Sequence, residues 1–363
     1  MKILITDPLS RKTFDVVNIL LRDYNLDDFV FLSDKNHSKV KKIYSIQKCF
    51  NLRSKSFNSD LLFISNNYRD HDIIFLPIEE KTIILFYNFI TKYGLKNFKA
   101  SLPSFDSFKL SRNKDELNLF CENNMIPCPK LYSKVHYNFP LIIKPINGSG
   151  SEGIKFVKSN NGFNINEVNF ENYFIQELLD NSRDIIAGFY LCKDGDVLSF
   201  YNHTRIRTFP KKGGVSVYSK SGEDIGVKCA GEKIIKNLNW SGLIMIEFLK
   251  DNVSNEFKLI EINPRLWGSI LLSEFNNSKF IKSYIELSLG NKLENYKIKQ
   301  DVFIRWVFPY DFLFFFDSPI SFFIKKANTC YLNFTYSTYM KSIKFILLTY
   351  FDFKKIKNKI YGK

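Results

Sequence analysis

Two apolar, strand-like runs carry carboxylates at matching positions. Glu247 lies in "LIMIEFLK" and Glu261 in "FKLIEINP", and a polar turn joins the runs. On adjacent antiparallel strands both carboxylates can point to one face of the sheet, which Asn263, two residues after Glu261, then shares. Two carboxylates and an amide oxygen suit Mg²⁺ held together with nucleotide phosphates. Because Arg265, two residues further on, can add a fixed cation for a phosphoryl group, the spacing predicts a metal and phosphate site.

A glycine-rich stretch, "PLIIKPINGSGSEGI" at residues 140–154, is a second phosphate-binding candidate. Gly148, Gly150 and Gly153 satisfy G-x-G-x-x-G, which dinucleotide-binding loops and protein-kinase phosphate loops share. A dinucleotide loop opens a helix, but the β-type residues "IKFVKS" follow Gly153. The nucleoside-triphosphatase loop also needs a helix, and the stretch misses its spacing by one position. Neither loop fits.

A kinase loop is excluded by the rest of the chain, because H-R-D-x-x-x-x-N and D-F-G are both missing from the sequence. The obvious lysine, Lys144, also precedes the glycines instead of following them. Two interpretations remain. The stretch is a flap between antiparallel strands whose backbone amides approach phosphates, or a structural hairpin with a Gly/Ser turn. Taken alone it fits both, and the distant metal-ligand pattern favours the flap.

The run "HTRIRTFPKKGGVSV" at residues 203–217 contains two arginines at strand spacing. We expect Arg205 and Arg207 to share one strand face, beside a flexible turn at Gly213-Gly214. They are then either a binding pair for an anion or two solvated strand arginines.

The elements that must position these groups change in type along the chain. Up to about residue 100, strand-like runs at 2–6, 27–34 and 72–77 alternate with helical spacing, which predicts a parallel sheet. The loop after the first strand, "DPLSR", lacks the glycine fingerprint for a dinucleotide. A helix is expected within residues 111–132, capped by Ser111 or Asn113 and ended by Pro127 and Pro129.

From about residue 140 to 265, apolar β-type runs alternate with turn signals, and Asp194-Gly195 marks a hairpin. This section is expected to be mostly antiparallel. The chain of 363 residues is thus long enough for two or three domains.

The net charge of +15 is concentrated at the C-terminus, where residues 325–363 carry nine Lys and one acid, Asp352. A basic, aromatic tail favours an anionic membrane surface or nucleic acid. A solvated Lys-rich helix face is the simpler explanation, because Lys, Asn, Ile and Phe are frequent throughout the chain. The apolar run 302–324 is interrupted by charges and prolines, so no membrane span is expected. No signal peptide is expected either, because the N-terminal "MKILITDPLS" starts a strand and lacks a long apolar run.

The six cysteines form no C-x-x-C pair, and the four histidines are scattered. Zinc sites and disulfide frameworks are therefore not expected, and a reducing cytoplasm is the expected location. No Ser-His-Asp or Cys-His arrangement points to a protein nucleophile.

Together, "PLIIKPINGSGSEGI", "YFIQELLDNSRD" and "LIMIEFL…FKLIEINPRLWGS" resemble the ATP-grasp superfamily, and most closely its carbamoyl-phosphate-synthase-like carboxylate–amine ligases. The resemblance covers roughly residues 100–290. It implies α/β and α+β architecture in four parts: a Rossmann-like pre-ATP-grasp domain (1–100), a small lobe with the glycine flap (101–180), a large lobe with the metal site (181–295) and a Phe/Lys-rich helical C-terminal extension (296–363).

The resemblance also implies roles for individual residues. Lys114 and Lys144 correspond to nucleotide-binding lysines, "QELL" to the hinge beside the adenine, and Asp184 to a ribose-binding glutamate, although Asp is one methylene shorter. The nucleotide-contacting set it implies is Lys114, Lys144, Gly148, Ser149, Gly150, Ser151, Gly153, Glu177, Leu178, Leu179 and Asp184.

For catalysis, the resemblance assigns Glu247, Glu261 and Asn263 to magnesium, with Mn²⁺ as an alternative metal. Arg265 matches the arginine beside the transferred phosphate, and Lys144 assists it. The 203–217 segment lies over the reaction centre in similar members, so Arg205 and Arg207 would hold the carboxylate or acyl phosphate.

The implied reaction is ATP-dependent activation of a carboxylate as an acyl phosphate, followed by attack of an amine-type nucleophile. Its partners would be small-molecule carboxylates and amines, with no nucleic acid, and with peripheral membrane contact through the C-terminus as an option. The alternative is a degenerate ATP-grasp protein that binds nucleotide and docks a membrane or partner through its basic, aromatic C-terminus. The sequence leaves the substrates and the oligomeric state open.

Overall fold

The computed structural model describes residues 1–33, 37–46, 50–51, 57–146, 153–179, 185–210, 214–307, 311, 314–315, 318–319, 322, 330–333 and 336–350. Contacts divide the chain into two compact units, one of residues 1–101 and 265–363 and one of residues 102–264. The four-part division expected from the sequence stays a prediction. Within these described ranges, no helix is long and apolar enough to cross a membrane.

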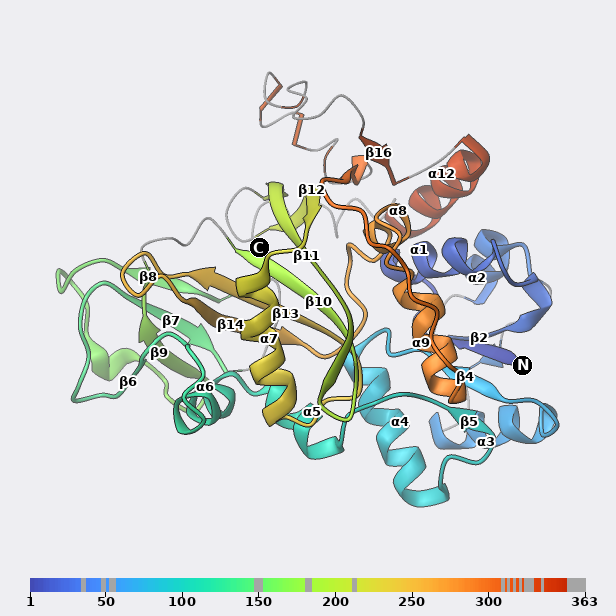
Figure 1. Ribbon diagram of the computed structural model, residues 1–363, viewed down its shortest axis with the longest axis horizontal. Helices are drawn as coiled ribbons and strands as arrows, with labels where there is room; N and C mark the ends of the chain where they lie inside the picture. The colour runs from blue at the N-terminus through green and yellow to red at the C-terminus, as the bar shows by residue number, and fades with distance from the viewer. Residues whose placement is uncertain are drawn as a thin grey trace. The chain divides into compact units, whose positions relative to one another are not determined.

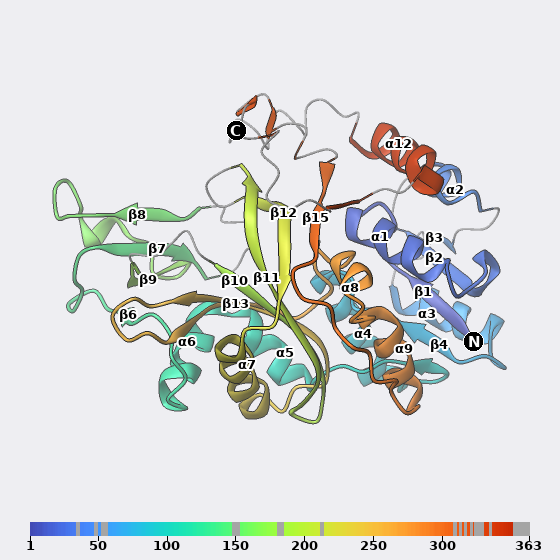
Figure 2. The same ribbon diagram turned by 45° about the horizontal axis from the view of Figure 1, so that its top comes forward.

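The first unit contains a sheet with the strand order β3-β2-β1-β4-β5, in which each strand pairs in parallel with its neighbours (Figures 1 and 2). This confirms the parallel pairing predicted from alternating strands and helices. The central strand β1 is covered on both faces, so Ile3, Leu4 and Ile5 are fully buried. The elements are β1 (Lys2–Ile5), α1 (Arg11–Leu20), β2 (Phe29–Ser33), α2 (His37–Tyr44), β3 (Phe50–Asn51), α3 (Phe57–Asn67), β4 (Ile73–Phe75), α4 (Glu80–Tyr93) and β5 (Phe98–Lys99).

The C-terminal part of this unit packs onto the N-terminal part. The ring of Phe345 stacks on that of Phe14 with centroids 4.5 Å apart, and Tyr284 donates its hydroxyl to the Phe75 carbonyl at 3.0 Å. One aromatic residue of the last helix is therefore buried against the N-terminal elements. The elements here are α8 (Leu272–Phe275), α9 (Phe280–Leu289), β15 (Phe303–Arg305), β16 (Tyr331–Leu332) and α12 (Tyr336–Tyr350).

The second unit is mostly antiparallel, as predicted. One sheet has the order β6-β9-β7-β8, and the longer strands run side by side in the order β14-β13-β10-β11-β12 (Figure 1). The Asp194-Gly195 hairpin is confirmed, because both residues have positive φ and join β10 to β11. The strands are β6 (Leu131–Tyr132), β7 (Leu141–Pro145), β8 (Lys155–Val157), β9 (Tyr173–Glu177), β10 (Ile186–Lys193), β11 (Asp196–Phe209), β12 (Val215–Gly222), β13 (Gly242–Lys250) and β14 (Phe257–Asn263).

The helix expected within residues 111–132 is α6 (Lys114–Asn123). Its N-cap is Asn113, one of the two predicted caps, although the Asn113 side chain makes no capping hydrogen bond. A separate helix, α5 (Phe105–Arg112), precedes it. Ser111 does not cap a helix, because it lies inside α5 and donates to the Phe108 carbonyl. α6 ends four residues before Pro127, so the prolines do not end it.

Helix α7 (Ile225–Asn237) covers one face of the long strands and leaves the other face to the site. Tyr190 on β10 donates its hydroxyl to the Val227 carbonyl at 2.7 Å. A Cβ at Gly231 would lie 2.1 Å from that hydroxyl oxygen, so only glycine lets the helix approach. Ala187 lies three residues from Tyr190 on the same strand and therefore belongs to the opposite face.

Candidate functional site

The two predicted metal-ligand carboxylates face each other across neighbouring strands. Glu247 on β13 pairs in register with Glu261 on β14, and Asn263 pairs with Met245. Residues directly opposite in an antiparallel pair share a face, so Glu247, Glu261 and Asn263 lie on one side of the sheet. Glu247 and Asn263 are nearly buried, at 8% and 6% exposure. The predicted placement of these three side chains on one face of the sheet is confirmed.

Each carboxylate is paired with a basic side chain of the same unit. The Arg205 guanidinium donates to Glu247 Oε1, and Lys114 Nζ lies 3.8 Å from Glu261 Oε2. Among the described residues no cluster of three or more His, Cys, Asp or Glu side chains could hold a metal ion. A cation here would therefore depend on the two glutamates, the asparagine amide oxygen and oxygens of its own ligand, as Mg²⁺ bound with phosphates does.

The Arg205–Glu247 pair reaches across β10, the strand between β11 and β13. Ala187 on β10 is opposite both Glu247 and His203, so a methyl group is the only side chain between the two outer strands in that row. His203 is buried, and its burial, with the Arg205 charge, lowers its pKa to about 3. The imidazole is therefore neutral at physiological pH and supplies no charge to the site.

Lys144 is buried on β7 and has a specific acceptor. Its Nζ donates to Gln176 Oε1 at 2.8 Å, and only 8% of the residue is exposed. Burial, together with the Lys114 charge, lowers its pKa to about 8, and the Glu261 charge partly offsets both effects. These interactions connect Lys144, Lys114 and Glu261 as one charged group. An anion bound beside Lys144 would stabilise its protonated form.

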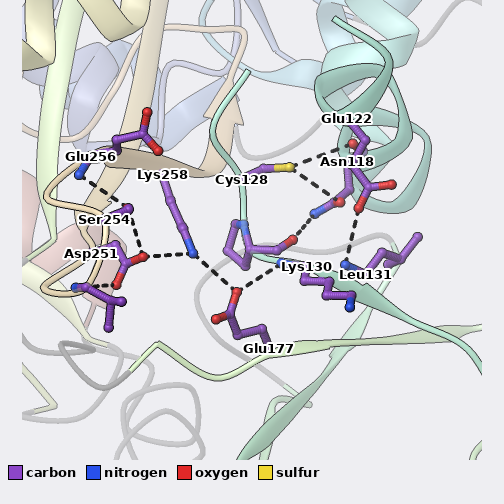
Figure 3. Close-up of polar contacts among 12 residues, drawn as sticks. Asn118, Glu122, Cys128, Lys130, Leu131, Glu177, Asp251, Ser254, Glu256 and Lys258 are labelled. Atoms are coloured by element: carbon purple, nitrogen blue, oxygen red, sulfur yellow. Dashed lines mark hydrogen bonds and ion pairs between the residues drawn. The ribbon is translucent and has the colours of Figure 1, made fainter. Parts of the chain in front are cut away.

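The hinge residue Glu177 is held in a network of charges (Figure 3). Its Oε2 accepts from the Lys130 backbone N–H at 3.2 Å and lies 3.3 Å from Lys258 Nζ, which also lies 2.9 Å from Asp251. The hydrogen bond from Lys258 is the main cause that lowers the pKa of Asp251 to about 2. The side chain of Glu177 thus anchors strand β9 to the β13–β14 hairpin.

The hinge continues after Glu177 with Leu178, which forms a backbone hydrogen bond, and Leu179, which is buried. The Leu178 N–H donates to the Pro140 carbonyl at 3.3 Å, and Leu179 is 6% exposed. Glu177 follows Gln176 directly in β9, so the hinge and the acceptor of Lys144 are adjacent.

The prediction that Arg205 and Arg207 share one strand face was wrong. A β-bulge between them places Arg205 opposite Ser219 and Arg207 opposite Tyr218. Since Ser219 and Tyr218 are consecutive on β12, they point to opposite faces, and so do the two arginines. Arg207 lies over the Tyr218 ring, 5.6 Å from its centroid, and away from Glu247.

Arg265 belongs to the first unit, where it contacts the segment after β4. Its Nε lies 3.3 Å from Glu80 Oε1, and beside it Lys12 pairs with Glu79 at 2.9 Å. Burial and the Arg265 charge together lower the pKa of Lys12 to about 8. These contacts follow the carboxyl ends of β1 and β4, an edge where parallel sheets commonly bind ligands.

The flap is described only at its C-terminal end. Gly153 has φ of +77°, a backbone conformation that favours glycine, and β8 then pairs antiparallel with β7. A strand therefore follows the glycines, which confirms that no dinucleotide-type helix begins there. Gly148, Ser149, Gly150, Ser151 and Asp184 lie outside the described residues.

Sequence reasoning missed Gln176, Lys258 and Lys12. Gln176 had a readable signal, because it is a polar residue inside the apolar strand "YFIQE". Lys258 and Lys12 gave none, since surface-type lysines are frequent in this chain and their partners are distant in sequence.

Comparisons with known proteins agree with this geometry. A sequence model of the ATP-grasp domain matches residues 111–269. D-alanine–D-alanine ligase B of Clostridium tetani is 26% identical over 234 residues, which are 56% of this chain and 60% of the ligase. The chain therefore spans less than two thirds of that relative.

Solved structures share the fold at low sequence identity. Biotin carboxylase from Campylobacter jejuni superposes with a TM-score of 0.62 and 14% identity over 83% of this chain and 74% of that chain. L-amino acid ligase from Bacillus licheniformis gives 0.59 and 12% over 80% and 74%. The resemblance seen in the sequence is confirmed over residues 111–269, which match the ATP-grasp domain.

Proposed function

We propose that the protein is an ATP- and Mg²⁺-dependent ligase that activates a carboxylate as an acyl phosphate and transfers the acyl group to an amine. The observation that carries the proposal is the register of Glu247 against Glu261, with Asn263 on the same face. This arrangement needs two buried or half-buried carboxylates on adjacent strands, which a sheet built only for stability would not favour.

The second unit supplies the groups proposed to hold the nucleotide. Lys144 and Lys114 would contact its phosphates, and the hinge from Glu177 to Leu179 would contact the adenine. The side chain of Glu177 is engaged with Lys258, so the hinge would recognise the base through its backbone. The glycines from Gly148 to Gly153, with Asp184 at the ribose, complete the proposed set.

Glu247, Glu261 and Asn263 would hold Mg²⁺, or Mn²⁺ in its place; the metal would neutralise phosphate charge and orient the reacting oxygens. Arg205, beside Glu247, would hold the substrate carboxylate, and Arg265 would oppose charge on the transferring phosphoryl group. No role is proposed for Arg207, because it points to the other face. The reaction then depends on positioning and charge, without a protein nucleophile.

The degenerate nucleotide-binding alternative is not favoured. A degenerate site would be expected to have lost ligands, whereas Lys114, Lys144, Arg205, Glu247 and Glu261 interact as one charged cluster. The use of α12 as a membrane-docking helix is further constrained by Phe345, which is 2% exposed.

The direct test is ADP release from Mg²⁺-ATP in the presence of pooled carboxylates and amines, including amino acids and sugar acids. Glu261→Gln should reduce turnover by roughly a thousandfold, because a metal ligand is removed without a change in size. Glu256→Gln is the matched control, since Glu256 is exposed on the same hairpin. Equal turnover by the Glu261 variant and the wild type would reject the proposal.

A further inference from the structure

The first unit contains a cavity that is separate from the residues proposed for ATP and metal. It lies among α1, α8, β16 and α12, and its volume is about 240 Å³. Liquid water occupies about 30 Å³ per molecule, so the space exceeds what one or two ordered waters would fill. Isoleucine, leucine and phenylalanine side chains form one part of its wall, and five polar residues form the rest: Asp15, Asn18, Arg22, Asn333 and Lys341.

Asp15 is the unusual member of this wall. It is 4% exposed, and its Oδ2 has no hydrogen-bond partner among the described residues. Burial raises its pKa to about 7, while the Arg11 charge acts in the opposite direction. Arg11 does not form an ion pair with it, and instead donates from Nη2 to the Gly268 carbonyl at 2.8 Å.

Keeping the Asp15 carboxylate ionised near neutral pH is costly at this buried position, and a cationic ligand in the cavity would offset that cost. The Tyr44 hydroxyl, whose titration is linked to the Asp15 charge, is not a partner for this carboxylate because it donates to the Pro8 carbonyl at 2.7 Å. The group best suited to Asp15 is therefore a cationic N–H donor inside the cavity.

The same wall also offers positive charge. Arg22 and Lys341 line the cavity and extend toward solvent. Arg22 lies 3.6 Å from Glu274, but Glu274 also has Lys279 at 2.7 Å, so Arg22 can turn to another anion without leaving Glu274 unpaired. The cavity thus combines a buried negative group with two basic side chains.

We infer that this cavity binds a small zwitterion of amino-acid size, with its ammonium group on Asp15 and its anionic group on Arg22 and Lys341. The apolar wall would contact the remainder of the molecule. The inference concerns binding in the first unit and stands independently of the proposed ligase reaction.

The test is calorimetric titration of the full chain, without ATP, with each standard amino acid at millimolar concentration. For the tightest binder, the decarboxylated amine and the deaminated acid are then titrated. At least one amino acid should bind, and both analogues should bind roughly tenfold or more weakly, because each lacks one charged hydrogen bond.

Asp15→Asn, which keeps the side-chain size, should weaken the same amino acid about tenfold or more. Arg22→Gln should also weaken it, whereas Asp23→Asn, at an exposed position after α1, should bind like the wild type. Circular dichroism and thermal unfolding check that each variant is folded. Binding of no amino acid, equal binding by folded Asp15→Asn, or equal binding of the amine analogue would each overturn the inference.

Discussion

Arg205 on β11 and Glu247 on β13 form an ion pair that crosses the intervening strand β10. The pair connects the group proposed to hold the substrate carboxylate with a proposed metal ligand. Both side chains are largely buried, so each charge affects what the other can bind. Arg205 competes with a cation for Glu247, and Glu247 competes with an anion for Arg205.

Replacement of Arg205 should therefore separate metal binding from turnover. In Arg205→Gln, Glu247 loses its competing cation, so Mn²⁺ should bind about tenfold more tightly. ATP turnover should nevertheless fall roughly a hundredfold, since a preorganised cation is lost. Electron paramagnetic resonance of Mn²⁺ and ADP release measure the two effects.

Arg207→Gln is the matched control for that experiment, because the bulge directs Arg207 to Tyr218 on the other face. Arg207→Gln should change neither Mn²⁺ affinity nor ATP turnover by more than about twofold. Weaker Mn²⁺ binding in Arg205→Gln would show that the ion pair organises the metal site instead of competing with it.

Lys144 should make nucleotide affinity depend on pH. Its folded-state pKa of about 8 lies below its ordinary value of 10.5, so the free protein loses the ammonium as pH rises through 8. If phosphates bind the protonated form, ATP affinity at about pH 9 should be roughly tenfold lower than at pH 7. Fluorescent-nucleotide titration measures this fall.

The variant Lys144→Met should bind ATP weakly at both pH values and should lose the pH-dependent fall. The free energy of unfolding changes with pH in the opposite direction to ATP affinity. Between pH 8 and 10.5 the unfolded chain holds the proton that the folded chain has lost, so the free energy of unfolding rises with pH there. Lys12 contributes in the same direction, so the comparison uses the difference between wild type and Lys144→Met. An unchanged pH profile in the variant would remove Lys144 from the site.

Gln176 should set the position of that pH profile. Gln176→Leu removes the acceptor at 2.8 Å from Lys144 Nζ, which should lower the lysine pKa further and move the fall in ATP affinity to lower pH. Gln176→Glu supplies a negative charge and should move it to higher pH. Opposite shifts in the two variants are required, and shifts in one direction would indicate a merely structural effect. The leucine variant should also lose about 1–3 kcal/mol of unfolding free energy.

The contact between α7 and Tyr190 should be the most sensitive packing point beneath the site. Gly231→Ala would place a Cβ 2.1 Å from the Tyr190 hydroxyl oxygen, so the helix must shift, with a loss of about 1–3 kcal/mol in urea unfolding. Cys229→Ala, at an exposed position of the same helix, should change stability by less than about 0.5 kcal/mol. Equal stability of wild type and Gly231→Ala would contradict this packing.

The sequence predicted the features that depend on simple alternation. Glu247, Glu261 and Asn263 lie on two strands joined by a short turn, so period-two spacing was enough to bring them together. The same rule failed at Arg207, because a bulge inserts a residue that no local pattern announces. The helix before the flap was predicted in position, with Asn113 as its N-cap, but it ends at Asn123, before the prolines that were expected to end it.

Contacts between distant segments were harder to predict for a different reason. Lys258 contacts both Asp251 and Glu177, and Glu177 is 81 residues away from it in the sequence. Nothing in the neighbourhood of Lys258 distinguishes it from other lysines. Gln176 could be recognised as a polar residue in an apolar strand, but its partner depends on the register of β7 with β9. Such registers are fixed by packing of whole sheets and not by adjacent residues.

Because Ala187 is the small residue in the row between Glu247 and His203, strand β10 must keep its register with both neighbouring strands. A slip of β10 by one residue would place Gly188 or Ile186 in the row between Glu247 and His203 and would turn every following side chain to the other face. Ile186 would block the space through which Arg205 reaches Glu247, and Tyr190 would leave α7. Insertions at the Asp194-Gly195 turn should leave the register of β10 unchanged. A single deletion before Ala187 should instead disrupt both the Arg205–Glu247 ion pair and the contact of Tyr190 with α7.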